Sequence, residues 1–384
     1  MFFDEPGTGP GLHALVIGVG GYPYLGGGAE ARPRQTLALD GIGPLTSPPR
    51  SALAFARHLA EGPRGAWHLP VRTVDVLLSW APGDEPDDSP AEVVTPTIDA
   101  IREAFEKWLK RCTANPDNMA LLYFCGHGLQ GDGQVLLADD VNRFPGSPFG
   151  QAFDFDRTRL ALQQRGPRTQ LFVVDACRIA DSGEIPLFAH PLADRSIFGA
   201  SACENELTLR MPPYEEASGR PAQISHLTSA LLRALEGQAA GTDESGRWVV
   251  RMEGVAAAID TLLLRELSVT TTHCGVETTS VGDAVLYRLH EAPHTRLTVR
   301  CLPPEAAART KLTCVPHEPP DSPHIHGGDP CDFPPDAEGR TVRQWELDVR
   351  AGIYTVRAAY DGSTTSRPQQ VWPPQSRMSL RVTS

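Results

Sequence analysis

Two residues, His127 and Cys177, have the side chains and the sequence surroundings that nucleophilic catalysis requires. A cysteine attacks as its thiolate, and it therefore needs a base or a positively charged partner within hydrogen-bond reach. An imidazole can fill that role and can afterwards protonate the leaving group. His127 lies within Cys125-Gly126-His127-Gly128 and Cys177 within Asp175-Ala176-Cys177-Arg178, and 50 residues separate the two. We therefore interpret them as a candidate catalytic pair.

Both residues follow apolar runs that predict buried strands. Met119–Phe124 and Leu171–Val174 are apolar throughout, which is typical of parallel strands covered on both faces. In open parallel sheets, catalytic groups gather at the carboxyl ends of the strands. His127 and Cys177 would meet at such an edge, where the backbone N–H groups of Gly128 and Cys177 are candidates for an oxyanion hole.

The rest of the first 290 residues alternates between strand and helix patterns. Short apolar runs predict strands at Ala14–Val19, Val71–Leu78, Val135–Leu137, Ser196–Ala200 and Val281–Leu289. Apolar residues at helical spacing predict helices at Ser51–Leu59, Thr97–Leu109, Asp156–Gln164, Leu227–Leu235 and Val255–Leu267. This alternation predicts an α/β fold with a mostly parallel sheet.

The pattern changes at His294, after which short strand-like runs alternate with turns rich in proline and glycine. The runs are Leu297–Leu302, Trp345–Val349, Ile353–Ala358 and Met378–Val382. They predict a small C-terminal β-sandwich domain. We therefore expect two domains, at residues 1–291 and 292–384, and the second could contact a protein partner.

Composition excludes several classes of partner. The 384-residue chain has a formal net charge of −12 and a dense acidic segment at Gly83–Asp88, whereas nucleic acids and anionic membranes require clustered positive charge. No stretch approaches the roughly 20 apolar residues of a membrane-spanning helix, and the first residues lack the features of a secretory signal. The eight cysteines do not have the spacing of a small disulfide scaffold. We expect a cytoplasmic protein with no nucleic-acid or membrane partner.

A second group of potential metal ligands lies in the C-terminal part of the chain. Cys314, His317, His324, His326 and Cys331 contain the Cys-x-x-His and His-x-His pairs that zinc sites use. The same segment is irregular and rich in proline, as a surface loop would be. We favour the loop, and predict neither a metal nor an organic cofactor. The cysteines that lack the context of Cys177 are expected to be structural: Cys112, Cys125, Cys203 and Cys274.

The blocks around the candidate pair match a known family. Tyr123–Gly128 corresponds to a Tyr-Phe-Ser-Gly-His-Gly block and Val174–Cys177 to an Asp-Ser/Ala-Cys block. On the basis of these two blocks, the chain resembles the caspase-like clan of cysteine peptidases, and it is most similar to the metacaspase-like and other bacterial members. The resemblance covers roughly Leu12–His290. It implies a six-stranded, mostly parallel sheet flanked by helices, with His127 and Cys177 as the catalytic dyad of an endopeptidase that cleaves protein substrates.

The resemblance also implies a preference for arginine or lysine before the scissile bond. Asp175 lies two residues before Cys177, so on a strand both side chains point to the same face. In metacaspases the matching Asp lines the first specificity pocket, where a carboxylate can pair with a guanidinium. A second carboxylate of that pocket is missing, because the metacaspase Asn-Asp-Ala block is Arg50-Ser51-Ala52 here. The alternative is that Asp175 merely accepts hydrogen bonds from loop N–H groups.

One segment occupies the position in the sequence at which caspase-like enzymes are often cut. Gly199–Cys203 resembles the family's next strand, and the polar, proline-rich Glu204–Gln223 follows it. We expect Glu204–Gln223 to be an exposed connection, with Arg210 and Arg220 as candidate self-cleavage sites.

Two other functions remain open at this point. The chain could be a catalytically silent caspase-like scaffold or interaction module, although both members of the dyad are present. It could also transfer acyl groups on a substrate that is not a peptide. By analogy with the family, a role in bacterial defence or regulated cell death is expected.

Overall fold

The chain divides into two compact units. The first consists of Met1–Leu232 and Ile259–Tyr287, and the second of Arg233–Ala258 and Arg288–Ser384. Arg233–Ala258 thus falls in the second unit, although the sequence placed it within a first domain ending at residue 291. The computed structural model describes residues 1–32, 39–62, 66–90, 93–131, 133–176, 179–180, 189–195, 200–211, 223–267, 276–317, 323–333 and 342–383.

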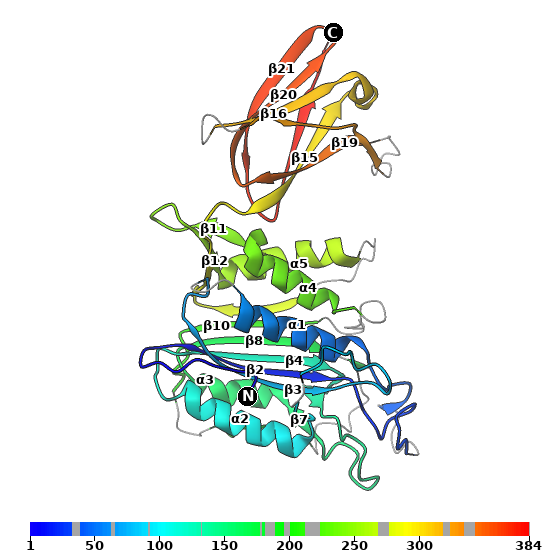
Figure 1. Ribbon diagram of the computed structural model, residues 1–384, viewed down its shortest axis with the longest axis vertical. Coiled ribbons are helices and arrows are strands. Elements are labelled where there is room, and N and C mark those ends of the chain that lie inside the picture. The colour runs from blue at the N-terminus through cyan, green and yellow to red at the C-terminus, as the bar shows by residue number, and fades with distance from the viewer. Residues whose placement is uncertain are drawn as a thin grey trace. The chain divides into compact units, whose positions relative to one another are not determined.

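A seven-stranded sheet forms the centre of the first unit (Figure 1). Its order is β1 (Phe3–Asp4), β3 (Val71–Ser79), β2 (Leu12–Val19), β4 (Met119–Gly126), β8 (Thr169–Ala176), β10 (Asn205–Arg210) and β13 (Glu277–Val281). The five inner strands are parallel, and the edge strands β1 and β13 are antiparallel to their neighbours. The mixed α/β fold is as expected, but the predicted count of six strands is wrong. The additional strand, β1, has only two residues, which is too short to leave a hydrophobic pattern.

The strand beside β8 also differs from the prediction. Residues 196–199 of the predicted strand Ser196–Ala200 lie outside the described part of the chain, and residues 200–203 form neither strand nor helix. The neighbour of β8 is β10, which pairs with it in parallel from Asn205 opposite Thr169 to Arg210 opposite Val174. The sheet therefore continues nine residues further along the chain than the sequence pattern indicated, since β10 begins at 205 instead of 196.

β10 is buried, although the sequence predicted an exposed connection there. Glu206 is fully buried, and Arg210 is 7% exposed. Each side chain has an ion-pair partner on α3: Arg159 lies 2.5 Å from Glu206, and Asp156 lies 2.5 Å from Arg210. The prediction of exposure is thus wrong for this stretch, because paired charges can be buried where single ones cannot. The other candidate cleavage site, Arg220, lies outside the described residues.

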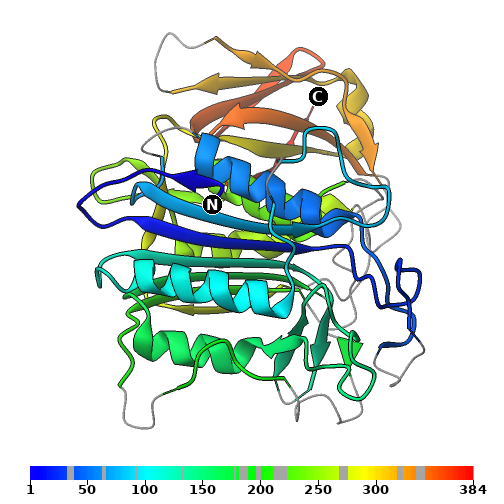
Figure 2. The same ribbon diagram turned by 60° about the horizontal axis from the view of Figure 1, so that its bottom comes forward.

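Helices cover both faces of the sheet (Figure 2). α1 (Ser47–Glu61) and α4 (His226–Arg233) lie on one face, and α2 (Ile98–Cys112) and α3 (Phe155–Arg165) lie on the other. Helices α2 and α3 begin at residues whose side chains accept a backbone hydrogen bond, Thr97 from Ala100 and Asp154 from Arg157. Such caps satisfy N–H groups that have no partner within the helix. The π-helix Ala234–Gln238 belongs to the second unit, whereas α5 (Met252–Leu267) and β14 (Val285–Arg288) have residues in both units.

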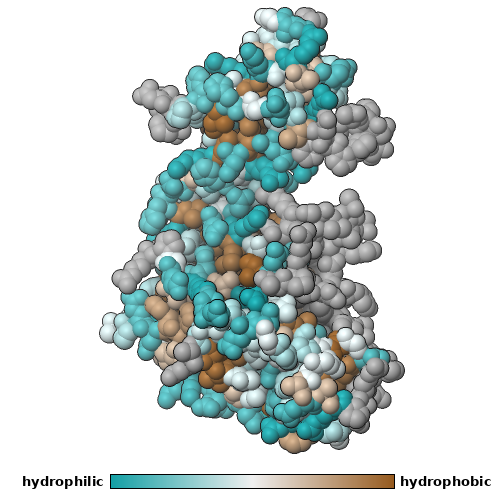
Figure 3. Space-filling view, turned by 45° about the vertical axis from the view of Figure 1, so that its right-hand side comes forward, coloured by the Kyte–Doolittle hydropathy of each residue, from teal (hydrophilic) through white to brown (hydrophobic). Residues whose placement is uncertain are grey.

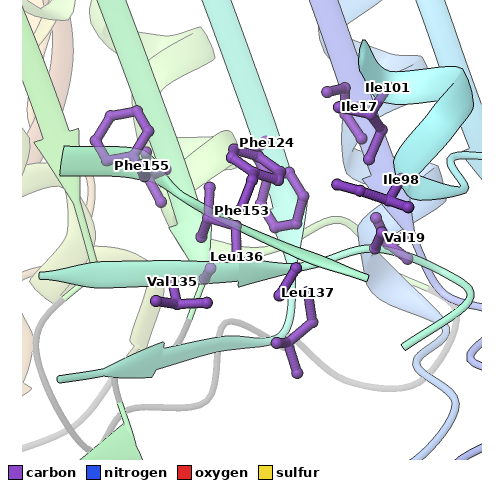
Figure 4. Packing of buried hydrophobic residues seen from close by; sticks show 14 of the residues in the cluster. Ile17, Val19, Ile98, Ile101, Phe124, Val135, Leu136, Leu137, Phe153 and Phe155 are labelled. Carbon is purple, nitrogen blue, oxygen red and sulfur yellow. The ribbon is translucent and has the colours of Figure 1, made fainter. Parts of the chain in front are cut away.

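A large hydrophobic cluster lies between the sheet and helices α2 and α3. Leu122 and Phe124 of β4 belong to it, as do Phe172 and Val174 of β8. Figure 4 shows Phe124 beside Phe153, and their rings meet edge to face with centroids 5.8 Å apart. Because side chains alternate along a strand, the odd-numbered residues of β4 and β8 face α1 and α4 instead.

A small second sheet lies beyond the end of β4. Its order is β7 (Ala152–Asp154), β6 (Gln134–Leu137), β5 (Gly128–Gln130) and β9 (Ile179–Ala180). β5 and β6 form an antiparallel hairpin, which places the predicted strand Val135–Leu137 within β6. His127 is the single residue between β4 and β5, so it connects the two sheets.

The second unit is built mainly from two four-stranded sheets. One has the order β18 (Cys331–Phe333), β19 (Val342–Arg350), β15 (His294–Leu302) and β22 (Gln375–Arg381). The other has the order β17 (Ile325–His326), β16 (Lys311–Pro316), β20 (Gly352–Tyr360) and β21 (Ser363–Val371). Strands of both sheets contribute to one hydrophobic cluster, which includes Trp345 and Val356. The unit also contains the 3₁₀ helix Pro304–Arg309 and the hairpin of β11 (Ala240–Thr242) and β12 (Trp248–Arg251).

On one face of the molecule, most of the described residues are hydrophilic (Figure 3). On the face shown in Figure 3, hydrophobic side chains form separate patches among polar ones. None of the helices in the described part of the chain has the length and apolar character needed to span a membrane.

Candidate active site

The residues that precede the two members of the predicted dyad lie side by side. β4 pairs with β8 so that Cys125 is opposite Asp175 and Gly126 is opposite Ala176. His127 is the next residue after β4, and Cys177 is the next residue after β8. Because neighbouring strands are about 4.8 Å apart and consecutive Cα atoms are about 3.8 Å apart, the ends of β4 and β8 lie close together. Cys177 itself lies outside the described residues.

The His127 imidazole is held by a main-chain carbonyl. Its Nε2 atom lies 2.7 Å from the oxygen of Gly43, and the residue is 8% exposed. A carbonyl oxygen can only accept, so Nε2 carries the proton of the neutral ring and Nδ1 carries the lone pair. Gly43 is itself constrained, because a Cβ atom there would collide with the carbonyl oxygen of Gly26. Nδ1 is therefore the atom that can accept a proton.

Tyr22 holds the backbone of His127. The N–H of His127 donates to the Tyr22 hydroxyl oxygen at 2.7 Å, and the two rings lie 4.7 Å apart between centroids. A Cβ atom on Gly126 would lie 2.7 Å from the same oxygen. Gly126 thus makes room for the phenol. Neither Gly43 nor Tyr22 could be predicted from the sequence, since a carbonyl has no side-chain signature and Tyr22 lies 105 residues from His127.

The Gly128 N–H points toward the edge of the small sheet at which β9 lies. Leu137 donates its N–H to the carbonyl of His127 at 3.1 Å, so His127 directs its backbone groups toward β6. Backbone groups of successive strand residues point to opposite edges. Gly128 therefore directs its groups away from β6 and toward β9, with which β5 pairs in parallel. The predicted oxyanion donor faces the side on which the chain continues after β8.

Asp175 lies on the face of the sheet covered by α1 and α4. It is fully buried, and it accepts hydrogen bonds from the hydroxyls of Ser225 and of Thr228, the latter at 2.8 Å. Burial raises the pKa of Asp175 to about 6, although these hydrogen bonds oppose the shift. Its second oxygen, Oδ1, has no hydrogen-bond partner from an N–H or O–H group of the described residues.

Ser51, which the sequence motif matches to a metacaspase carboxylate, joins this network. Its hydroxyl oxygen accepts a hydrogen bond from the N–H of Ser225 at 2.8 Å and donates to the carbonyl of Ser47 at 2.8 Å. The serine is fully buried. The residues singled out in the sequence for the specificity pocket, Asp175 and Ser51, are thus connected through Ser225.

Within the described part of the chain, the remaining cysteines and histidines do not form a group of potential metal ligands. Cys314 is buried and Cys331 exposed, and no three His, Cys, Asp or Glu residues of the described chain are grouped as metal ligands. Burial raises the pKa of Cys203 to about 12 and that of Cys112 well above its usual value. Such thiols are poor nucleophiles at neutral pH. Cys274 lies outside the described residues.

Comparison with known proteins agrees with this geometry. Residues 68–251, which include the ends of β4 and β8, match the family model described as a caspase domain of the peptidase C14 family. The chain is also 28% identical over 185 residues to the uncharacterized protein y4kE of Sinorhizobium fredii. That match covers 47% of this chain and 53% of the relative, so the chain spans about half of the relative's length. By this match, residues 68–251 contain a caspase-like domain, which supports a relation to the caspase-like clan of cysteine peptidases.

Proposed function

We propose that the protein is a cysteine endopeptidase with His127 and Cys177 as its dyad. One observation supports this most strongly. His127 sits at the end of β4 with Nε2 bonded to Gly43, so its proton-accepting Nδ1 belongs to a fixed imidazole. The adjacent strand β8 ends one residue before Cys177.

The proposed reaction has two stages. Nδ1 of His127 takes the thiol proton of Cys177, and the sulfur attacks the carbonyl carbon of the scissile peptide bond. The carbonyl oxygen becomes an oxyanion, which accepts hydrogen bonds from the N–H groups of Gly128 and Cys177. The C–N bond then breaks as His127 gives its proton to the leaving amine. Water, deprotonated by His127, hydrolyses the thioester and restores the thiol.

Substitution of the dyad tests this function. Fluorogenic peptides with different residues before the cut are incubated with the wild-type protein, Cys177→Ala and His127→Ala. We expect cleavage by the wild type alone, with all three proteins equally folded by circular dichroism, because each residue directly follows the end of a strand. Turnover by Cys177→Ala would contradict the dyad. Absence of cleavage by a folded wild type under every condition would favour the scaffold function.

We also propose that cleavage follows arginine or lysine. Asp175 is a fully buried carboxylate beside the end of β8, and its Oδ1 accepts no hydrogen bond from an N–H or O–H group of the described residues. A guanidinium reaching it would form a strong, selective pair. Opening of the segment around Ser225 would be required, because Asp175 is covered among the described residues.

For the C-terminal region we propose a β-sandwich domain with a partner-binding role. The two sheets of the second unit share one hydrophobic cluster, whose members lie between Leu297 and Val382. A region with its own core can carry a separate function.

A further inference from the structure

We propose that Tyr22 is a positioning residue for His127, and that its hydroxyl group acts as a spacer between His127 and strand β6. The inference rests on the proposed function, in which His127 is the base of the dyad. It adds a residue from a loop that carries neither dyad member and lies outside the matched caspase region, which begins at residue 68.

The Tyr22 hydroxyl lies between His127 and Leu137 of β6, where a regular ladder would have a direct hydrogen bond. The β5–β6 register extends by one pair to His127 and Leu137, and the Leu137 N–H donates to the His127 carbonyl at 3.1 Å. In a regular antiparallel ladder the His127 N–H would donate back to the Leu137 carbonyl. Here it donates to the Tyr22 oxygen at 2.7 Å, and the Tyr22 hydroxyl donates to the Leu137 carbonyl at 3.4 Å. The phenol oxygen therefore keeps the two strands apart at this pair.

The neighbouring residues leave room for this oxygen and confine the imidazole. A Cβ atom at Gly126 would lie 2.7 Å from the Tyr22 oxygen and 3.2 Å from the Cβ of Val19. The imidazole contacts the Tyr22 ring on one side, and Gly43 accepts from its Nε2. Tyr22 thus contacts both the backbone and the ring of His127, which fixes the direction of Nδ1.

Tyr22 is itself fixed in an unusual backbone conformation. Its φ angle is +42°, in the left-handed region that non-glycine residues rarely adopt. The N–H of Tyr22 donates to Oδ1 of Asp139 at 3.1 Å, and Asp139 is only 6% exposed. Asp139 also receives a hydrogen bond from Ser79, whose hydroxyl oxygen accepts the N–H groups of Gly20 and Gly21. A strained residue held by a buried carboxylate is typical of functional sites.

Loss of the hydroxyl should displace His127. In Tyr22→Phe, the buried His127 N–H either lacks a partner or bonds directly to the Leu137 carbonyl, which draws the two strands together. Either outcome moves the imidazole relative to the end of β8. A misplacement of about 1 Å can lower the rate by about 100-fold.

The test compares Tyr22→Phe with a matched control. Tyr354→Phe removes the hydroxyl of another buried tyrosine, which donates to the Arg350 carbonyl at 2.8 Å in the second unit. For both variants and the wild type we measure kcat and KM. We also measure the pH dependence of Cys177 alkylation by iodoacetamide, located by peptide mass spectrometry, which needs no turnover. The melting temperature reports folding.

For Tyr22→Phe we expect kcat to fall by about 100-fold with little change in KM. The apparent pKa for Cys177 alkylation should rise toward the value of about 8.5 of a free thiol. Tyr354→Phe should resemble the wild type. If Tyr22→Phe does not fold, Gly126→Ala replaces it, because the added methyl group displaces the same oxygen, and the same changes are expected.

The outcomes separate this inference from the proposed function. A folded Tyr22→Phe that cleaves and alkylates like the wild type overturns the positioning role and leaves the endopeptidase intact. If no peptide is cleaved but Cys177 alkylation still depends on His127 and Tyr22, the endopeptidase fails and the positioning role stands. Alkylation that Tyr354→Phe alters as strongly as Tyr22→Phe also overturns the positioning role.

Discussion

The polar side chains at the ends of β4 and β8 have different kinds of partner. His127 is held by the carbonyl of Gly43, by main-chain pairing with Leu137 and by one phenol oxygen. Asp175, one strand away, is held by the hydroxyl groups of Ser225 and Thr228. Both residues are buried, with exposures of 8% and 0%.

The two sites differ in which of their hydrogen-bond partners a point mutation can remove. A carbonyl partner is present whatever side chain the residue carries, whereas a hydroxyl partner is lost by a single substitution. The environment of His127 therefore depends on two main-chain groups and on one side chain, the Tyr22 phenol. The environment of Asp175 depends on the side chains of Ser225 and Thr228. We expect the reaction to be set at the first site and the choice of substrate to be tunable at the second.

Removal of the Asp175 carboxylate should have the largest effect on substrate choice. Asp175→Ala should lower cleavage after arginine by well over tenfold, because a buried charge pair worth roughly 2–5 kcal/mol is lost. Cleavage after alanine, compared in matched fluorogenic peptides, should change much less. A preference for aspartate, or equal loss for all peptides, would mean that other residues form the pocket.

The same carboxylate should make stability depend on pH. The folded-state pKa of Asp175 is raised to about 6, from an unfolded value of 3.8. The folded protein thus binds the proton more tightly, and the contribution of Asp175 to stability is present in full below pH 3.8 and is lost as pH rises through 6. The shift corresponds to about 3 kcal/mol.

Denaturant titration of the wild type and Asp175→Asn at pH 4 and pH 7 measures this contribution of Asp175 to stability. From pH 4 to pH 7, the free energy of unfolding of the wild type should fall by up to about 3 kcal/mol relative to that of Asp175→Asn. Thr228→Ser, which keeps the hydroxyl, serves as the control and should follow the wild type. A difference between the wild type and Asp175→Asn that is independent of pH would contradict the raised pKa.

Truncation should have the smallest effect on the reaction. Each unit has its own hydrophobic cluster: one lies between Leu15 and Ala189, and the other between Leu297 and Val382. A protein ending at Glu291 should therefore stay soluble and keep the peptide-cleavage rate of the full chain. Its melting temperature is measured as well, because Arg233–Ala258 belongs to the unit that is cut. Unfolding of the truncated protein would show that the two units depend on one another.

Apolar runs in the sequence predicted most of the inner sheet. β2, β3, β4 and β8 begin within two residues of their predicted starts, because strands buried on both faces leave continuous apolar runs. β10 was missed for the opposite reason. Its Glu206 and Arg210 are polar, and only the positions of Arg159 and Asp156 on α3 reveal that they can be buried.

The candidate site could be predicted only where side chains carry the chemistry. His127, Cys177 and Asp175 stand out because each lies at or just after the end of a strand, in a short motif. Gly43 and Tyr22 do not, because their contributions are a carbonyl oxygen and a contact across a long loop. The role of Gly126 is also visible only in the structure, which shows that its missing side chain leaves space for the Tyr22 phenol oxygen.

The central claim is that His127 activates Cys177 across the β4–β8 pair. It is tested most directly with an irreversible, thiol-directed peptide probe that resembles a substrate, followed by mass spectrometry of the labelled protein. We expect one adduct, on Cys177, in the wild type, no adduct in Cys177→Ala and strongly slowed labelling in His127→Ala. An adduct on a different cysteine, or equal labelling of the wild type and His127→Ala, would contradict the claim.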